Sequence, residues 1–126
     1  MSWQEYVDKN LVGSGRIAKA AILGLQGGVW SKSPGFEISP KEQKDIVDGF
    51  TNADNIQASG IRAAQEKYLT LRADGRSIYG KKGADGIVLV KTKQAVLVGV
   101  YEAPTQAGEA TPIVEGLADY LIGVGY

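Results

Sequence analysis

Residues 67–101 read KYLTLRADGRSIYGKKGADGIVLVKTKQAVLVGVY, and this stretch decides the fold. Short strand-like segments follow one another with turn residues between them. Asp74-Gly75 is a strong hairpin signal, and further turns are expected over residues 83–86 and 93–94. The stretch therefore predicts four short strands joined as an antiparallel meander.

Two of these predicted strands are apolar along their whole length. Residues 87–90 read IVLV, and residues 95–100 read AVLVGV. A strand with one face in water alternates polar and apolar residues, so both faces of these strands should be covered. Helices packed on the two faces of the sheet would cover them.

Two helices are signalled by their starting residues. Ser2 and Glu5 have the spacing of a capping box, and apolar residues then recur at helical intervals as far as Leu11. Ser39 and Glu42 have the same spacing, with a proline at the first helical position. We therefore predict one helix at the N-terminus and a second from residue 40, with Ile46, Val47 and Phe50 as the buried stripe of the second.

The other segments complete the order of elements. Residues 17–25 and 29–30 predict a hairpin around a Gly-Gly turn, and residues 51–60 are expected to form a loop. Apolar residues return at helical spacing after about residue 105. Either Thr111 and Pro112 begin this last helix, or Pro112 lies in the first turn of a helix that starts slightly earlier. The order is helix, strands, helix, strands, helix, which predicts an α+β fold with an antiparallel sheet.

Composition limits the classes of function. With 126 residues, of which 44% are apolar, the chain is expected to form a single domain over residues 1–126. It has no cysteine and no histidine, which excludes disulfides, Ser–His and Cys–His nucleophile systems and the usual zinc sites. The acidic residues are scattered, and no pair of them is marked out for acid–base catalysis. No cofactor and no metal are expected, and the family resemblance described below implies a binding protein and not an enzyme. The sequence shows no signal peptide and no long apolar run, so an intracellular, soluble protein is expected.

Charge is balanced overall and uneven along the chain. The 14 Lys and Arg match 14 Asp and Glu, so no global field favours nucleic acid or membrane. Residues 61–101 hold eight basic and three acidic residues, a net charge of +5, whereas residues 102–126 carry four acids and no base. Two interpretations stay open for the basic residues: a solvated strand face, or one patch for an acidic partner, either protein or phospholipid. The six on or near strand ends are Arg72, Arg76, Lys81, Lys82, Lys91 and Lys93.

A near match to a phosphate-binding loop occurs at residues 75–82, GRSIYGKK. The pattern requires a Ser or Thr at its last position to hold magnesium, and Lys82 stands there. Such a loop must also open a helix, and this segment has the pattern of a strand. We therefore do not expect nucleotide binding through it.

Large aromatic residues are concentrated at the two chain ends. Trp3 and Tyr6 lie near the N-terminus, where Val7 and Leu11 already supply an inward stripe, so one aromatic is in excess of what the core needs. Trp30 and Tyr126 add to this excess. Exposed Trp and Tyr make rigid binding platforms, and aromatic grooves recognise polyproline II segments.

Three motifs together resemble those of the profilin family. They are the opening MSWQ-x-Y, the segment LRADGRSIYGK, and the ending QAGEA…VEGLADYLIGVGY. The similarity covers essentially the whole chain and is greatest to the fungal and plant-like forms. The resemblance implies the profilin fold: a central antiparallel sheet, with the N- and C-terminal helices packed on one face and small helices on the other.

The resemblance also implies partners and binding residues. In profilins, aromatics of the two terminal helices bind proline-rich segments of proteins such as formins, and the matching residues here are Trp3, Tyr6, Trp30, Tyr120 and Tyr126. Many animal profilins have histidine where this chain has Tyr120. The residues matching the monomeric-actin site are Arg72, Arg76, Tyr79, Lys81, Lys91 and Glu115. Arg72 and Arg76 also match a weaker phosphoinositide site, and Pro112 departs from many relatives near the actin contacts.

The expected function is regulation of actin filament assembly by a cytoplasmic, cytoskeletal monomer that binds actin and proline-rich proteins. Two alternatives remain. One is a proline-motif adaptor that has lost actin binding. The other is a phosphoinositide-binding module with the same fold and no function in the aromatic groove.

Overall fold

The computed structural model describes residues 2–126, and its seven strands form one antiparallel sheet. The strands lie in the order β2-β1-β7-β6-β5-β4-β3. Their bounds are β1 Lys19–Gly24, β2 Val29–Lys32, β3 Ile61–Ala63, β4 Glu66–Ala73, β5 Ser77–Lys82, β6 Asp85–Lys91 and β7 Ala95–Tyr101. The meander predicted from residues 67–101 is therefore confirmed as β4 to β7. The short strand β3, paired to β4 at the sheet edge, was not predicted.

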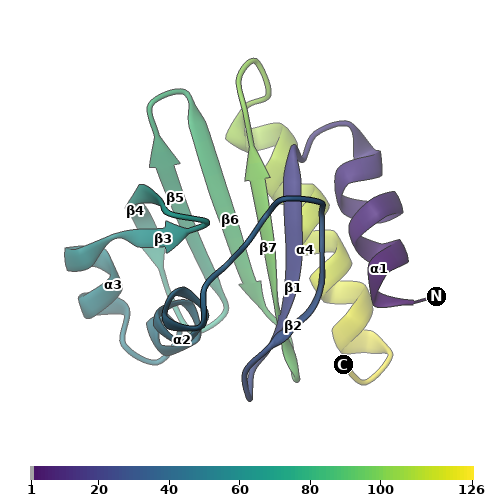
Figure 1. Ribbon diagram of the computed structural model, residues 1–126, viewed down its shortest axis with the longest axis horizontal. Helices are drawn as coiled ribbons and strands as arrows, with labels where there is room; N and C mark the ends of the chain where they lie inside the picture. Colours follow the sequence, from purple (N-terminus) through teal and green to yellow (C-terminus); the bar gives the residue numbers. More distant parts are fainter. Residues whose placement is uncertain (1) are drawn as a thin grey trace.

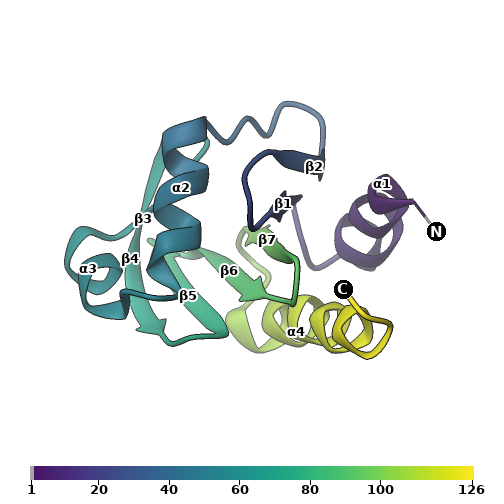
Figure 2. The same cartoon turned by 90° about the horizontal axis from the view of Figure 1, so that it is seen from below.

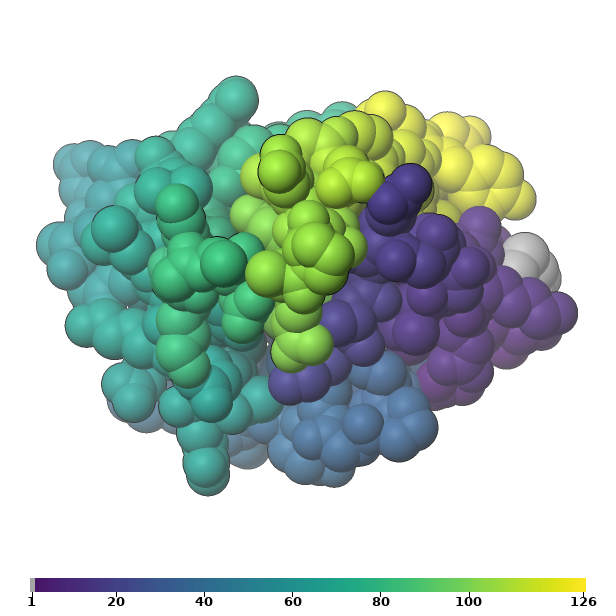
Figure 3. Space-filling view, turned by 90° about the horizontal axis from the view of Figure 1, so that it is seen from above, coloured from purple at the N-terminus to yellow at the C-terminus, as the bar shows by residue number. Residues whose placement is uncertain are grey.

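Helical segments cover both faces of this sheet. The N-terminal segment runs through α1 Trp3–Glu5, the π-helical turn η1 Tyr6–Leu11 and the 3-10 turn η2 Val12–Ser14. It lies beside α4 Ala107–Gly123 on one face, while α2 Pro40–Gly49 and α3 Ala53–Ser59 lie on the other (Figures 1 and 2). In the space-filling view the C-terminal residues, in yellow, lie next to the N-terminal helix, in purple (Figure 3).

The core is divided into two layers by the sheet. One layer packs Val7, Leu11 and the inner row of α4 against β1, β6 and β7. The other packs Ile46 and Phe50 of α2, with Ile56 of α3, against the opposite face. Central strands β6 and β7 are buried on both faces, as their continuous apolar sequence predicts.

Both capping boxes are present. Ser2 accepts from the Glu5 amide, and Ser39 accepts from the Glu42 amide, each at 3.2 Å. The predicted stripe of α2 is confirmed for Ile46 and Phe50, whereas Val47 is only partly buried.

The structure contradicts one prediction about the helices and decides between two alternatives for another. Residues 51–60 are not a loop, because the side chain of Asn52 caps α3 by accepting from the Asn55 amide, and Ile56 is buried. For the last helix, the alternative with the earlier start is confirmed, since α4 begins at Ala107, while Pro112 lies in its second turn and not in its first.

The two terminal helices cover only part of their face of the sheet. Helix α4 packs on β6 and β7, and η1 packs on β1. Within residues 2–126 no helix lies over this face of β3 and β4, and α4 reaches β5 only at its border, where Glu115 bonds Ser77 and Tyr79. We call this uncovered surface the open half of the sheet.

Candidate functional site

Five aromatic side chains form one continuous set of ring contacts, which we call the aromatic platform: Trp3, Tyr6, Trp30, Tyr120 and Tyr126. Trp3 is at its centre, with ring centroids 4.7 Å from Trp30, 5.1 Å from Tyr126 and 5.7 Å from Tyr6. Tyr6 continues the set to Tyr120 at 6.3 Å. The structure thus brings together all five residues of the predicted proline site, from three segments distant in sequence.

Members of the platform differ in exposure. Trp30, Tyr126 and Tyr120 are 37%, 43% and 54% exposed, so each offers a ring face or edge to a ligand. Tyr6 is only 9% exposed and belongs to the core layer beneath the platform. Burial, and after it the neighbouring Tyr120 phenol, raises the pKa of Tyr6. Tyr6 therefore stays neutral at physiological pH and supports the exposed rings.

Local contacts fix the two tryptophans. The capping box begins the first helix at Trp3, whose carbonyl accepts from the Ser31 hydroxyl at 3.1 Å. This bond joins the N-terminal helix to β2, the strand that carries Trp30. The Trp30 ring lies against Gly24, where an added Cβ would come within 2.5 Å of the indole nitrogen. Only glycine at position 24 leaves room for the ring in this orientation.

The platform continues into an open cleft between η1 and α4. Its volume is about 440 Å³, and Tyr6 and Tyr120 form one end. Ile113 and Leu117 supply apolar lining, and Gly116 leaves the wall without a side chain.

The open half of the sheet is a second exposed surface with both charged and apolar character. Strand register places Arg62 opposite Lys67, Leu69 opposite Lys81, and Arg72 opposite Tyr79, so these six side chains share one face. Among the described residues, Arg62, Lys67 and Lys81 make no ion pair. The surface is therefore positively charged, with a leucine and a tyrosine between the cations.

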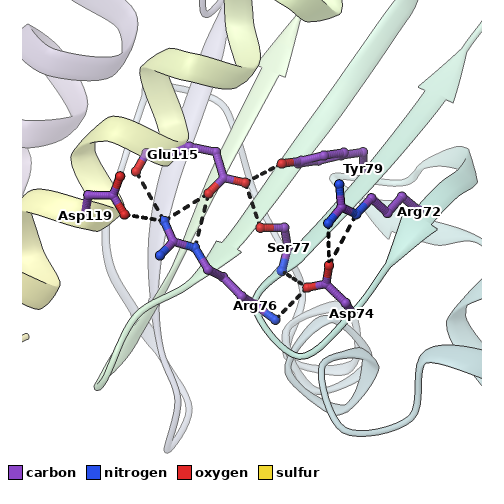
Figure 4. A network of polar contacts seen from close by, with 7 residues as sticks. All are labelled: Arg72, Asp74, Arg76, Ser77, Tyr79, Glu115 and Asp119. Carbon is purple, nitrogen blue, oxygen red and sulfur yellow. Dashed lines mark hydrogen bonds and ion pairs between the residues drawn. The ribbon is translucent and has the colours of Figure 1, made fainter.

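A polar network borders the open half where it meets α4 (Figure 4). The Glu115 carboxylate accepts from Arg76 through Oε1, at 3.0 and 3.2 Å, and through Oε2 from the hydroxyls of Ser77 and Tyr79. Asp119 accepts a further bond of 2.6 Å from Arg76. The network joins β5 to one side of α4 and fixes the edge of the Tyr79 ring.

Arg72 extends this network to the β4–β5 turn. Its guanidinium donates to Asp74 at 3.0 Å and lies 5.7 Å from the centroid of the Tyr79 ring. Amides of Ser77 and Arg76 donate to Asp74 and, with a smaller effect of Arg72, hold the pKa of that carboxyl below its usual range. Asp119, and then Glu115, raises the pKa of Arg76. Burial, and then the bond to Glu115, raises the pKa of Tyr79.

Of the two interpretations of the six basic residues, the single patch is wrong. Arg72 and Lys81 lie on the open half, and Arg76 is paired with two acids of α4. Strand alternation puts Lys82, which pairs with Glu66, and Lys91 on the opposite face of the sheet. Lys93 lies beside Trp30, around a small cleft next to the platform. Much of the positive charge of residues 61–101 is therefore neutralised or dispersed.

Two exposed leucines were missed in the sequence. Leu69 and Leu71 on β4 are 66% and 57% exposed, the highest values among the large apolar side chains of the described residues. Leu71 lies where the β4–β5 register shifts, and it borders an open recess of about 520 Å³ that is also lined by Tyr101 and Pro104. Leucine in a strand indicates burial by default, so no local signal identified these two.

Comparison with known proteins identifies the family of this chain. The family model described as Profilin matches residues 1–126. This chain belongs to the profilin family. The resemblance inferred from its motifs is thus confirmed, and the profilin fold with it.

Relatives at about 55% identity and a more distant neighbour share the length and the fold of this chain. This profilin is 55% identical to Profilin-1A of Acanthamoeba castellanii over 126 residues, which is 100% of both chains. The structure of Acanthamoeba castellanii Profilin IB superposes with a TM-score of 0.97 at 54% identity, covering 99% of this chain and 100% of that one. Mouse Profilin IIa, solved with a double repeat from the FH1 domain of mDia1, has the same fold, with a TM-score of 0.83 at 22% identity and full coverage of both chains.

Among residues 2–126, this profilin has neither a candidate metal cluster nor a helix suited to span a membrane. Over residues 2–126, no group of three or more His, Cys, Asp or Glu side chains is placed to hold a metal ion. The helices of that same part are all too short or too polar to cross a membrane.

Proposed function

We propose that this profilin binds monomeric actin on the open half of its sheet and proline-rich segments on its aromatic platform, and so regulates filament assembly. The observation that carries the proposal is the presence of two separate exposed surfaces on different sides of α4. Their chemistries differ, one being aromatic and the other cationic with exposed leucines. Such a protein acts by binding and not by catalysis, in the cytoplasm with the cytoskeleton.

The platform suits a polyproline II ligand for physical reasons. Such a segment is already extended and loses little conformational entropy on binding. Rings of Trp3, Trp30 and Tyr126 supply faces for proline rings, while indole N–H and phenol O–H groups donate to ligand carbonyls. Successive ring centroids along the platform are 4.7, 5.7 and 6.3 Å apart, which corresponds to about one and a half to two residues of a polyproline II segment at about 3.1 Å per residue. A formin FH1 segment, the kind of ligand held by mouse Profilin IIa, is the natural probe.

The open half suits an acidic protein surface with apolar contacts at its centre. Lys67, Lys81 and Arg72 would steer an acidic partner, and Leu69 with Tyr79 would be desolvated on contact. Actin is the partner that the family predicts. Of the residues expected at this site, Arg72, Tyr79 and Lys81 lie on the surface itself. Arg76 and Glu115 support it from the border, and Lys91 lies on the other face.

Phosphoinositide head groups are a weaker proposed ligand, at Arg72 and Arg76. Both guanidinium groups already donate to carboxylates of the chain, so a phosphate would have to displace them. We therefore expect weak binding that strengthens in Asp119→Asn, which frees part of Arg76. Co-sedimentation with vesicles containing phosphoinositide, against vesicles with phosphatidylserine at equal charge, measures this.

A calorimetric titration of one protein sample, first with monomeric actin and then with an FH1 peptide, tests the main proposal. Binding of both ligands supports it. Binding of the peptide alone would indicate a proline-motif adaptor that has lost the ability to bind actin. Binding of neither, together with phosphoinositide vesicle binding, would indicate a lipid module and would refute the proposal.

A further inference from the structure

The turn between β6 and β7 is bonded to Tyr126 of the aromatic platform, although it contributes none of the rings. Thr92 in this turn is only 4% exposed. Its hydroxyl donates to the main-chain oxygen of Tyr126 at 2.8 Å and accepts from the Ala95 amide at 3.1 Å. The Gln94 amide donates to the same oxygen of Tyr126 at 2.7 Å. A buried polar side chain and a turn amide thus converge on one acceptor.

The same turn also contacts the hairpin that carries Trp30. The carbonyl of Gln94 accepts from the Leu25 amide at 3.0 Å, just after β1 ends. Residues 92–94 are therefore bonded both to the last residue of the chain and to the β1–β2 hairpin. These two segments carry Tyr126 and Trp30, which flank Trp3 in the platform.

Tyr126 depends on these bonds because little else holds it. Its ring is 43% exposed and meets Trp3 edge-on, with an interplanar angle of 88°. Its amide donates to the Leu121 carbonyl at 2.8 Å, which fixes one side of the residue to α4. Thr92 and Gln94 fix the other side to the sheet. An exposed ring keeps a defined position only when its main chain is held in this way.

We propose that Thr92 is a positioning residue of the aromatic platform: its buried hydroxyl holds Tyr126 against Trp3 and so raises the affinity for proline-rich ligands. The affinity part of this proposal rests on the proposed proline-binding function. Valine at position 92 has the same shape and cannot donate to Tyr126 or accept from Ala95. Serine keeps the hydroxyl and loses only a methyl group, so it is the matched control.

Thr92→Val and Thr92→Ser test the proposal, with decaproline as the ligand. One neutral hydrogen bond contributes about fivefold in an equilibrium constant, or about 1 kcal/mol. We expect Thr92→Val to bind decaproline about fivefold more weakly, and Thr92→Ser to bind it like the parent. Actin affinity should not change in either, because the turn lies away from the open half. A role limited to the stability of the turn would lower the unfolding midpoint and leave the decaproline affinity of the folded protein unchanged.

A measurement without ligand separates this proposal from the proposed function. The nuclear Overhauser contact between the Trp3 and Tyr126 rings should weaken in Thr92→Val and return in Thr92→Ser. An unchanged ring contact in Thr92→Val, or equal weakening in both variants, would overturn the positioning role. If the parent protein fails to bind decaproline, the proline-binding function is refuted, while the ring contact still decides the role of Thr92. If Thr92→Val does not fold, hydrogen exchange of the Gln94 backbone amide in the parent protein tests the proposal instead. Exchange of that amide without protection would overturn the proposal.

Discussion

Replacing Tyr79 by arginine should abolish measurable actin binding while the fold and the aromatic platform survive. The Tyr79 ring lies at the edge of the open half, beneath the guanidinium of Arg72. Arginine there removes an aromatic contact and places a new cation close to Arg72 and Arg76. The Glu115 carboxylate can offset it only in part, because Oε1 already accepts from Arg76 and Oε2 from Ser77.

The expected loss of actin affinity in Tyr79→Arg follows from these contacts. Truncating an aromatic anchor at an interface costs about 2 kcal/mol, and a buried charge without a full partner costs about 2–5 kcal/mol. Even the sum of the lower values corresponds to a loss of more than about 100-fold in affinity. Tyr79→Phe is the matched control. It keeps the ring and removes only the bond to Glu115, which should lower the free energy of unfolding by about 1 kcal/mol and change actin affinity by less than about threefold.

Titration of monomeric actin into each variant, with urea unfolding and circular dichroism on the same samples, measures both effects. Pure charge attraction predicts the opposite sign, since an added cation should strengthen binding to an acidic partner, and salt should weaken it. A folded Tyr79→Arg variant that binds actin as well as the parent would place Tyr79 outside the interface. Equal losses in Tyr79→Phe and Tyr79→Arg would assign the effect to the hydroxyl and refute the reasoning from the ring.

The other predictions concern the platform, the independence of the two surfaces and the fold. Trp3→Ala should weaken proline-peptide binding about thirtyfold, with loss of the fluorescence response to peptide, and leave actin affinity within about threefold. Arg72→Glu should do the reverse in the same titrations. Glu42→Ala should lower the urea-measured free energy of unfolding by at least about 2 kcal/mol, because the buried carboxylate accepts from the amides of Ser39, Ala64 and Gln65. Asp74→Asn should be less stable than the parent at pH 7. Because the pKa of Asp74 is lowered in the fold, this difference should shrink as the pH falls below the ordinary Asp value of about 3.9.

Features of the fold with local causes were predictable from the sequence. A capping box is a short-range signal, so both helix starts at Ser2 and Ser39 were identified correctly. The Asp74-Gly75 turn and the continuously apolar strands are also signalled by residues next to one another in the sequence. Helix α3 was missed because Asn52 favours both turns and helix caps, and only the burial of Ile56 decides between them. The start of α4 stayed open between two alternatives because a proline usually marks the first turn, and here it lies in the second turn.

The candidate site was predictable in part. An excess of aromatics at the chain ends indicated a surface role, and the family resemblance supplied the five residues. The pairing of Arg76 with Glu115 and Asp119 was not predictable, since it joins residues about 40 positions apart through the register of β5 against α4. The same holds for the exposure of Leu71, because a register shift in β4 interrupts the alternation that a strand pattern assumes.

Helix α4 contributes to both surfaces, and its packing explains why they should act independently. Glu115 and Tyr120 are five residues apart, which places them about 140° apart around the helix axis at 3.6 residues per turn. Between these two sides, Val114, Leu117, Ala118 and Leu121 are buried against the sheet. Coupling between sites requires an element with two alternative arrangements. A helix whose inner row is close-packed has only a single arrangement. On the proposed function, a ligand on one surface would therefore leave the residues of the other surface in place, and one molecule would hold actin and a proline-rich segment together.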